Sequence, residues 1–432
     1  MSTAAHVPSA PDTLEDVGFI ARLARQLVLK KLGALQDGQL QVVLEDGEER
    51  LFGATSEGAT SESDLRARVT IHSPAFYSKI AFGGTLGASE AFMDGDWTAD
   101  EPTNVVRILL RNRGQLDGIE GGWGRLLKPA HMVVHWLRRN TRAGARKNIE
   151  AHYDLGNDFY ELFLDPTMMY SCAVYENPEM TLEEASTAKL DRLCQKLDLQ
   201  PEDHVLEIGT GWGGFAEHAV KNYGCRVTTT TISPSQASYA RERIQKAGLA
   251  ERVEILEKDY RDLEGSYDKL VSIEMIEAIG HDQMNQFFEV CSARLKDDGI
   301  MALQAITIAD RFYERSRRSV DFIQRYIFPG SALPSVGSLN RSIARTDLTA
   351  LHMEDIGPHY AVTLATWRQR FFDNLKSIQE LGFSDRFVRT WQYYFCYCEG
   401  GFSERSIGDI QLVLSKPMAR PRSLLGSLQR PL

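Results

Sequence analysis

From about residue 185 onward, short apolar stretches typical of strands alternate with stretches of helical spacing. Strands are predicted over 204–209, 225–232, 253–259, 267–275 and 299–307, and helices over 213–224, 234–248 and 281–295. Strands and helices that alternate in this way form a parallel sheet with helices on both faces. The sequence therefore predicts an α/β fold of the doubly wound class for this part of the chain.

Four glycines lie within six positions directly after the first of these strands, at Gly209, Gly211, Gly213 and Gly214. Glycine destabilises a helix by roughly 1 kcal/mol relative to alanine, so this cluster at a helix start indicates a need for bare backbone. Doubly wound folds bind ligands at this turn. A dinucleotide is one candidate, but the next strand, CRVTTTTIS, has only threonines where an acidic residue is expected for the ribose. A nucleoside with an amino-acid tail, S-adenosylmethionine, fits better; the alternative without a ligand is packing of the helix on the strand.

The first 120 residues have a different pattern. An amphipathic helix is predicted over 19–35, a hairpin over 40–53 with its turn at Asp46-Gly47, a strand over 66–73, and a loop followed by a helix over 82–97. These elements indicate a small α+β domain over residues 1–120 without a catalytic cluster.

A basic segment follows over residues 121–149, with no acidic residue in it. We interpret it as a linker that forms a local basic patch in an acidic protein. One reading is a solvated helix face, and the other is contact with anionic lipid head groups. Its basic residues are Arg125, Lys128, Arg138, Arg139, Arg142, Arg146 and Lys147.

The composition excludes several classes of protein. A formal net charge of −10 over 432 residues argues against a nucleic-acid-binding protein, which needs a basic footprint. No apolar run is long enough to span a bilayer, and the N-terminus lacks the features of a secretory signal. The six cysteines form no CxxC pair, and His152, His281 and His359 are not spaced as a metal site. We therefore expect a reduced cytoplasmic protein without a metal.

Further motifs follow one another in a specific order. They are AHYDLGNDFYELFLDPTMMYSCAVYE (151–176), VLEIGTGWGGFA (205–216), TISPSQ (231–236), KDYRDL (258–263), IEMIEAIG (273–280), RYIFPGSALPS (325–335), HYAVTLATW (359–367) and CEGGFSERSIGDIQLVLSKP (398–417). In these motifs the chain resembles the cyclopropane-fatty-acyl-phospholipid synthases, which are related to the mycolic acid cyclopropane synthases. The resemblance is strong over 150–417 and looser before it. It implies a Rossmann-like class I S-adenosylmethionine-dependent methyltransferase domain over 150–417, a lipid-associated domain over 1–120, and a tail over 418–432.

The resemblance also implies a reaction. The methyl group of S-adenosylmethionine is transferred to a cis double bond of an acyl chain in a membrane phospholipid, and the carbocation loses a proton and closes to a cyclopropane ring. Because an alkene is a poor nucleophile and the cation offers no hydrogen-bonding group, we expect a dry, aromatic site with a base. The partner would be a phospholipid bilayer with unsaturated chains, contacted peripherally at its inner face, and a homodimer is left open.

Residues that match the family's donor-binding motifs come from five segments. Tyr170 and Ser171 would meet the methionine end of S-adenosylmethionine, and Gly209, Gly211 and Gly213 form the glycine turn. Thr231 and Gln236 would reach the ribose and tail, while Tyr260 and Arg261 would border the adenine. As alternatives, Tyr170 belongs to the core and Gln236 to a helix surface.

The base of this family is thought to be a bound bicarbonate ion. The residues that match its holders are Glu277, Tyr360, and Cys172 and Ile306 through their backbones. A carboxylate in an apolar pocket has a raised pKa and shares a proton with bicarbonate. Cys398 matches a cysteine once assigned as catalytic, but a thiol beside a carbocation has no clear task, so a structural role is expected.

The chain departs from the common family pattern at two positions near this predicted base. Ala278 follows Glu277 where histidine is usual, and Gln304 replaces a histidine two residues before Ile306. Glutamine still donates a hydrogen bond to bicarbonate but does not titrate. These departures leave the anion site in place and the proton route open.

Residues 310–330 mix arginines with aromatic residues between core strands. This insertion suits an acyl tunnel with a head-group clamp at its mouth, and the alternative is a pair of surface helices with ordinary salt bridges. Two rival functions remain: a methyl- or methylene-branching fatty acyl C-methyltransferase, and a non-catalytic lipid-binding protein on a methyltransferase fold.

Overall fold

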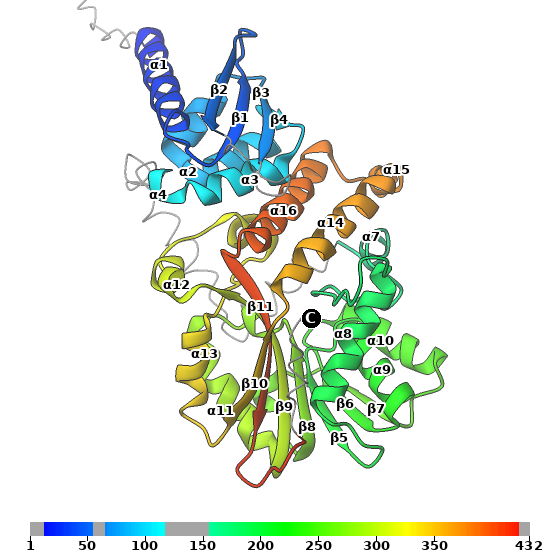
Figure 1. The fold of residues 1–432 in the computed structure, drawn as a ribbon. Helices are drawn as coiled ribbons and strands as arrows, with labels where there is room; N and C mark the ends of the chain where they lie inside the picture. The colour runs from blue at the N-terminus through cyan, green and yellow to red at the C-terminus, as the bar shows by residue number, and fades with distance from the viewer. Residues whose placement is uncertain (1–12, 55–64, 117–154, 423–432) are drawn as a thin grey trace, which may run out of the picture. The chain divides into compact units, whose positions relative to one another are not determined.

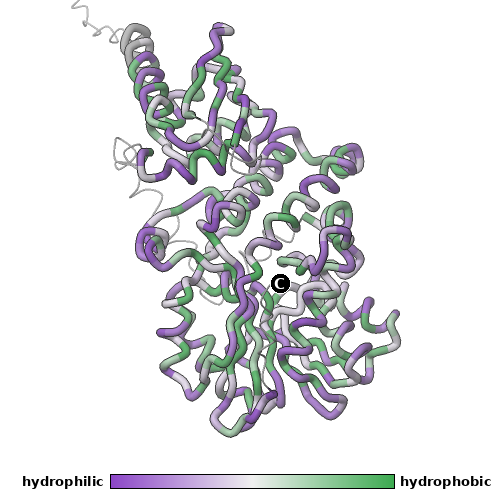
Figure 2. The backbone as a smooth tube through the Cα atoms, viewed as in Figure 1, coloured by the Kyte–Doolittle hydropathy of each residue, from purple (hydrophilic) through white to green (hydrophobic). Residues whose placement is uncertain are grey.

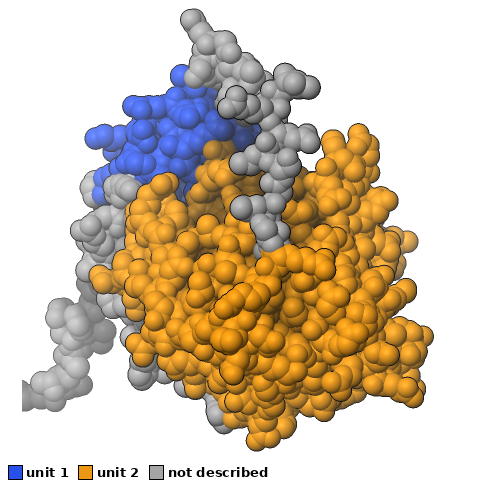
Figure 3. All heavy atoms as spheres, turned by 60° about the horizontal axis from the view of Figure 1, so that its bottom comes forward, with its two compact units in different colours: residues 1–129 blue, residues 130–432 orange. Residues whose placement is uncertain are grey.

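The computed structural model describes residues 13–54, 65–116 and 155–422. The chain divides into two compact units, residues 1–129 and 130–432 (Figure 3). The predicted basic linker over 121–149 and most of the predicted tail lie outside the described residues.

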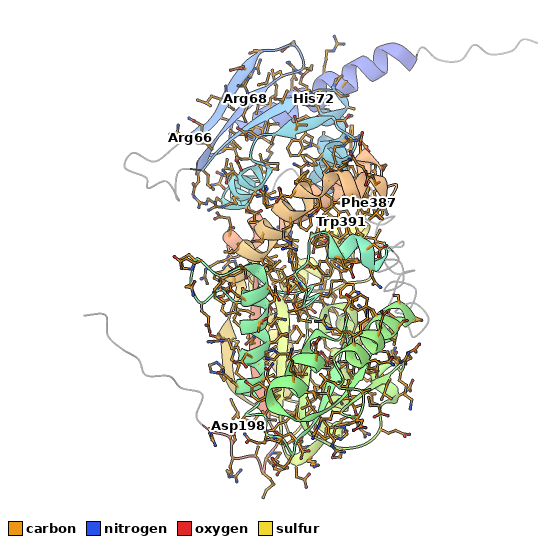
Figure 4. The ribbon with its side chains drawn as sticks, turned by 90° about the vertical axis from the view of Figure 1, so that its right-hand side faces the viewer. Arg66, Arg68, His72, Asp198, Phe387 and Trp391 are labelled. Atoms are coloured by element: carbon orange, nitrogen blue, oxygen red, sulfur yellow. The ribbon has the colours of Figure 1, made fainter. Side chains whose placement is uncertain are left out.

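The first unit contains a four-stranded sheet with the strand order β2-β1-β3-β4. Its elements are α1 (Thr13–Leu32), β1 (Gly38–Val43), β2 (Glu49–Ala54), β3 (Arg66–Ile71), α2 (Ala75–Met93), β4 (Trp97–Ala99), α3 (Pro102–Arg111) and α4 (Arg113–Leu116). The predicted hairpin is present, with Gly47 in its turn at a φ of 84°. Along β3, Arg66 and Arg68 are exposed between buried apolar residues (Figure 4).

One expectation for this unit is wrong. The loop expected at the start of 82–97 is absent, because its residues lie inside α2, where Gly84 interrupts the helical geometry with a φ of 57°. The small residues here mark a kink in a helix rather than its start, because glycine adopts this backbone conformation without steric cost.

The second unit contains a seven-stranded sheet. Its elements are α7 (Asn157–Glu161), α8 (Leu182–Lys196), β5 (His204–Ile208), α9 (Gly214–Tyr223), β6 (Arg226–Thr230), α10 (Pro234–Lys246), β7 (Val253–Leu256), η1 (Tyr260–Asp262), β8 (Tyr267–Ile273), η2 (Ile276–Ala278), η3 (His281–Gln283), α11 (Met284–Arg294), β9 (Leu295–Ile308), α12 (Asp310–Ser316), the π-helical η4 (Ile323–Ile327), α13 (Val336–Ile343), β10 (Thr349–Asp355), α14 (Gly357–Asp373), α15 (Leu375–Glu380), α16 (Asp385–Ser403) and β11 (Ile407–Ser415).

The strand order is β10-β11-β9-β8-β5-β6-β7. Strands β9, β8, β5, β6 and β7 are parallel, as predicted, but β11 is antiparallel to both β9 and β10, so the sheet is mixed. The order reverses at β5, whose neighbours are β6 and β8. Ligands of doubly wound folds bind at the carboxyl ends of the strands next to such a reversal.

Alternate residues of the strands face two separate cores. On one face, Leu206 and Leu270 pack with α11 and α13, and on the other, Val205 and Val271 pack with α8, α9 and α10. The strands between these helices are largely hydrophobic (Figures 1 and 2). A strand buried on both faces reads as a nearly continuous apolar run, which explains why the sequence marks these strands clearly.

A third group of helices lies over the carboxyl ends of the strands. Helices α14 and α16 pack against each other there (Figure 1). The hydroxyl of Tyr360, on α14, donates a hydrogen bond to Glu274, the first residue after β8. The helices therefore cover the region where the sheet topology places the ligand.

Candidate active site

The four glycines after β5 differ in what surrounds them. A Cβ on Gly214 would lie 2.6 Å from the carbonyl oxygen of Thr167, and one on Gly209 or Gly213 would lie 3.2 Å from a neighbouring side chain. Gly211 has a φ of 52°, and a Cβ there would meet nothing within 4 Å. Packing therefore accounts for three of the glycines, whereas Gly211 borders open space.

The other predicted donor-binding residues lie around the carboxyl ends of β6 and β7. The Thr231 hydroxyl donates to Oε1 of Gln236 at 3.0 Å, and both residues are buried. Tyr260 is buried, and its hydroxyl has no hydrogen-bond partner among the described residues. Arg261 is held by the carboxylate of Asp259, with its Nε 2.8 Å from Oδ1. The predicted role of Gln236 as a helix-surface residue is thus excluded.

Two further residues belong to this region. Ser171 accepts a hydrogen bond from Nζ of the fully buried Lys189 at 2.8 Å. Glu207, on β5 two residues before Gly209, was missed in the sequence, although an acid directly before a glycine turn was a usable signal. Burial raises its pKa to about 8, and its Oε2 has no partner among the described residues. An orphaned buried oxygen beside the glycine turn fits a polar ligand there.

The residues predicted to surround the base converge on Glu274, which the sequence analysis did not single out. Its Oε1 accepts the backbone N–H of Cys172 at 2.9 Å and the side-chain amide of Gln304 at 2.7 Å. Its Oε2 accepts the hydroxyl of Tyr360 at 2.7 Å. Burial and the charge of Glu274 raise the pKa of Tyr360 well above its ordinary value, so this hydroxyl remains a donor.

The backbone of Glu274 has an unusual conformation. Its φ is 48°, in the left-handed region, which costs a residue other than glycine about 1–3 kcal/mol and persists only where the surroundings enforce it. Its N–H donates to the carbonyl oxygen of Gln304 at 2.9 Å. Hydrogen bonds thus fix both the backbone and the carboxylate of Glu274 at the end of β8.

Glu277 lies one turn further along, in η2. Its Oε1 accepts the backbone N–H of Ile306 at 2.5 Å, while its buried Oε2 has no partner among the described residues. Burial and then the charge of Glu274 raise the pKa of Glu277 to about 8. Glu277 is therefore largely neutral at neutral pH.

These contacts test whether a bicarbonate ion fits the predicted holders. The Cys172 N–H, the Tyr360 hydroxyl and the Gln304 amide all donate to Glu274, and the Ile306 N–H donates to Glu277. Carboxylates of the chain therefore engage every donor assigned to the ion. The residues present do not fit a bound bicarbonate, which corrects that expectation.

Gln304 links two acids, the partly buried Glu274 and the buried Asp409. Its amide nitrogen lies 2.7 Å from Glu274 and 3.2 Å from Oδ2 of Asp409, and its Oε1 accepts from the amide of Gln411 at 3.0 Å. Burial and the charge of Glu274 raise the pKa of Asp409 well above its ordinary value. The bond to Gln411 fixes the orientation of the Gln304 amide, so that its donor side faces the acids.

An aromatic wall adjoins the acids. The Tyr170 hydroxyl donates to that of Tyr394 at 3.1 Å, and the Tyr170 ring lies 5.2 Å from Trp367. The ring of Tyr360 stacks on Phe402 at 4.4 Å and contacts Trp367 at 6.0 Å. Aromatic faces attract cations, so this wall suits a reaction that passes through a carbocation.

The aromatic layer continues along α16 away from the acids. Phe387 and Trp391 lie on this helix (Figure 4), with their rings 5.4 Å and 4.8 Å from that of Phe159 on α7. The ring of Tyr170, which contacts Trp367, belongs to the same large aromatic cluster. Its contacts are therefore compatible with a role in the core.

Cys398 and the insertion over 310–330 lie near this wall. Burial raises the pKa of the Cys398 thiol, so it stays protonated at neutral pH and is a poor nucleophile. In the insertion, Phe322 is buried against Tyr393 and Phe328 contacts Tyr170, both through their rings. Its exposed arginines are Arg311, Arg315, Arg317 and Arg318. The acyl tunnel and head-group clamp remain predictions.

Two kinds of feature are absent from the described residues. None of their helices combines the length and apolar character needed to cross a bilayer. No three of the His, Cys, Asp and Glu side chains in these ranges are grouped to hold a metal ion.

The strand order and the glycine turn are those of the doubly wound class, and the similarity to solved cyclopropane synthases, one of them complexed with SAH, identifies a class I S-adenosylmethionine-dependent methyltransferase. The family model described as mycolic acid cyclopropane synthetase matches residues 140–412, and the chain belongs to this family. The predicted family, fold class and enzyme class are thereby confirmed.

Two relatives are similar to this chain over most of their length. A tuberculostearic acid methyltransferase of Mycobacterium tuberculosis is 38% identical over 354 residues, which is 80% of this chain and 82% of that protein. A cyclopropane-fatty-acyl-phospholipid synthase of Escherichia coli is 36% identical over 365 residues, 83% of this chain and 90% of that protein.

Solved structures of two cyclopropane synthases resemble this chain. A cyclopropane synthase of Mycobacterium tuberculosis has a TM-score of 0.59 and 31% identity, and the match covers 63% of this chain and 98% of that one. A mycolic acid cyclopropane synthase complexed with SAH and CTAB has a TM-score of 0.59 and 32% identity, with the same coverage.

Proposed function

We propose that this chain transfers the methyl group of S-adenosylmethionine to the cis double bond of unsaturated acyl chains in membrane phospholipids, and that the product is a cyclopropane ring. The observation that carries the proposal is the partly buried carboxylate of Glu274, held by three donors, between a glycine turn and an aromatic wall. This arrangement supplies a donor site, a surface that tolerates a cation and an acceptor for a proton.

When bound, S-adenosylmethionine supplies an electrophilic methyl group. The glycine turn binds its tail, with Gly211 allowing close approach to the backbone. The ring of Tyr360, which contacts that of Trp367, adjoins Glu274, and such rings would stabilise positive charge that develops on the acyl chain while excluding water. A carboxylate at the end of β8 accepts the proton that the cation loses.

A methyl- or methylene-branching reaction is the second candidate function. It is favoured by the 38% identity to a protein named as a tuberculostearic acid methyltransferase. The two reactions share methyl transfer and differ in which proton is removed. Loss of a proton from the new methyl group closes the ring, whereas loss from a neighbouring carbon leaves an alkene.

The test is an analysis of the lipids of a host that lacks such an enzyme and expresses this chain. We expect upfield cyclopropane proton signals in the NMR spectrum of the extracted acyl chains, absent from the same host with an empty vector. Vinylidene signals without them would assign the chain to the branching reaction. Binding of S-adenosylmethionine with no modified lipid would identify a non-catalytic lipid-binding protein.

The substrate lies within a bilayer, so the proposed function includes peripheral association with the inner face of the membrane. The exposed arginines of α12 and the turn after it support this association, because each basic residue near an anionic surface contributes about 1 kcal/mol.

A further inference from the structure

We infer that Glu274 is the general base of the reaction, a carboxylate of the chain itself in the place of a dissolved anion. The inference rests on the proposed function, which it deepens by naming the group that removes the proton. The donors predicted to hold a bicarbonate ion instead donate to carboxylates of the chain, and most of them to Glu274.

The hydrogen bonds around Glu274 match the needs of an anionic base. An ionised carboxylate is an acceptor only, and Glu274 accepts from a backbone N–H, a side-chain amide and a hydroxyl that retains its proton. The carboxyl of Asp409, whose pKa is raised well above its ordinary value, is a further hydrogen-bonding neighbour. These donors fix both carboxylate oxygens of Glu274 within a partly buried site. A base held in this way is oriented before the substrate arrives, which lowers the entropic cost of proton transfer.

The position of Glu274 relative to the glycine turn supports the same role. In the parallel pairing of β5 and β8, Glu207 is opposite Val271, so the two strands end side by side just before Gly209 and Glu274. A Cβ on Gly209 would lie 3.2 Å from the side chain of Met275, the residue after Glu274. Tyr360, which donates to Glu274, is itself part of the aromatic wall. Glu274 therefore lies between the donor turn and that wall.

Ring closure couples methyl transfer to the loss of one proton. An alkene carbon of the acyl chain forms a bond to the methyl carbon as the sulfur–methyl bond breaks, and the other alkene carbon becomes cationic. Glu274 takes a proton from the new methyl group, and the electron pair of that C–H bond forms the bond that closes the ring. The positive charge that entered with the sulfonium leaves as this proton, which Glu274 releases to water before the next turnover.

The backbone of Glu274 offers a sharp variant. Because glycine adopts a φ of 48° without strain, Glu274→Gly should keep the turn while removing the carboxylate and freeing its three donors. An anion of similar shape could then bind in the space. Glu274→Gln is the complementary variant, since it fills the same space but does not accept a proton at neutral pH.

The first experiment measures methyl transfer to vesicles of unsaturated phospholipid in buffer freed of carbon dioxide, with and without added bicarbonate. Wild type should turn over equally in both. Glu274→Gly and Glu274→Gln should each lose at least about a hundredfold in turnover. Bicarbonate should restore turnover at least about tenfold in Glu274→Gly only. Wild-type turnover that needs bicarbonate, or near-normal turnover of Glu274→Gln, would overturn the inference.

The second experiment does not depend on lipid turnover. We expect saturable binding of carbon-13-labelled bicarbonate, seen by NMR, to Glu274→Gly but not to wild type. Binding to wild type would overturn the inference, whereas an absence of lipid methylation by wild type would overturn the proposed function alone.

Asp198→Gly provides the matched control for both experiments. Asp198 also has a left-handed φ, of 51°, and lies at the opposite end of the unit from Phe387 and Trp391 (Figure 4). Asp198→Gly also replaces an acidic residue at a left-handed φ by glycine, but far from the site. Its turnover should equal that of wild type and should not depend on added bicarbonate.

Discussion

At the scale of single residues, two glutamates three positions apart have different surroundings. Glu274 accepts three hydrogen bonds, while Glu277 accepts one and leaves its second oxygen buried without a partner among the described residues. Pairs of acids whose environments differ in this way divide the roles of proton acceptor and neutral partner. In its neutral form Glu277 still accepts the hydrogen bond from the Ile306 N–H. It places no second negative charge beside Glu274.

The raised pKa of Glu277, about 8, predicts a pH-dependent stability. As pH rises from the ordinary glutamate range towards 8, the native state keeps a proton that the unfolded chain has released, so the free energy of unfolding falls. Glutamine does not titrate, so Glu277→Gln removes this pH-dependent fall in the free energy of unfolding. Its amide oxygen can still accept the hydrogen bond from the Ile306 N–H. We expect its stability relative to wild type to improve by about 1–3 kcal/mol between about pH 5 and about pH 8.5, measured by urea denaturation.

Glu354→Gln serves as the control. Its hydrogen bonds to Arg192 and Lys196 lower the pKa of Glu354 to about 2, so the group is ionised in both states across this range. Its replacement should destabilise the fold by the same amount at both pH values. A pH-independent effect of Glu277→Gln as well would contradict the assigned protonation state.

At the scale of elements, the glycines in the turn from β5 into α9 serve two different purposes. Three of them permit close packing against Met275, Ala240 and Thr167, and only Gly211 borders open space. Ligand binding and helix–strand packing are thus both served by the turn, and neither explanation alone accounts for the cluster.

Gly211→Val should abolish or greatly weaken binding of S-adenosylmethionine while the fold is retained. A branched side chain would occupy the open space and is strained at a positive φ. Gly224→Val is the matched control, because Gly224 ends the same helix with a φ of 72° and a Cβ there makes only ordinary contact with Pro201. Calorimetry that finds equal affinity in the two variants would refute the donor site at this turn.

The elements near the glycine turn were predictable because the signals that define them are local. Periodicity identifies the parallel strands, but the antiparallel β11 pairs with β9 through residues about a hundred positions apart, such as Ile410 and Ala305. The role of Glu274 was hidden for the same reason. Its donors, Cys172, Gln304 and Tyr360, are separated from it by 102, 30 and 86 positions. Only the folded chain brings them to one carboxylate.

At the scale of the whole molecule, a chain with a net charge of −10 is repelled on average by an anionic membrane. Attraction must therefore come from local basic surfaces. Within the described residues, α12 and the turn after it expose four arginines, and Glu314 forms ion pairs with Arg317 and Arg318. The predicted linker over 121–149 would add to this attraction.

We expect the protein to bind vesicles that contain anionic phospholipid, and to dissociate as salt rises to several hundred millimolar, since salt screens exposed charges. The double variant Arg311→Glu and Arg318→Glu should bind at least about tenfold more weakly, because two charges are reversed and the net charge of this surface changes by four units. Lys246→Glu, on α10, is the control and should bind like wild type in a sedimentation assay. Salt-insensitive binding to neutral vesicles would instead indicate that apolar insertion dominates.

The left-handed backbone at Glu274 has a consequence for how such proteins diverge. Glutamate and glycine codons differ by one base, and this conformation accommodates both residues without any shift of the main chain. If Glu274 is the base, a single point mutation would exchange a reagent encoded in the gene for one drawn from the carbon dioxide dissolved in the cell. We would then expect an enzyme with the glutamate to keep its activity where that gas is scarce.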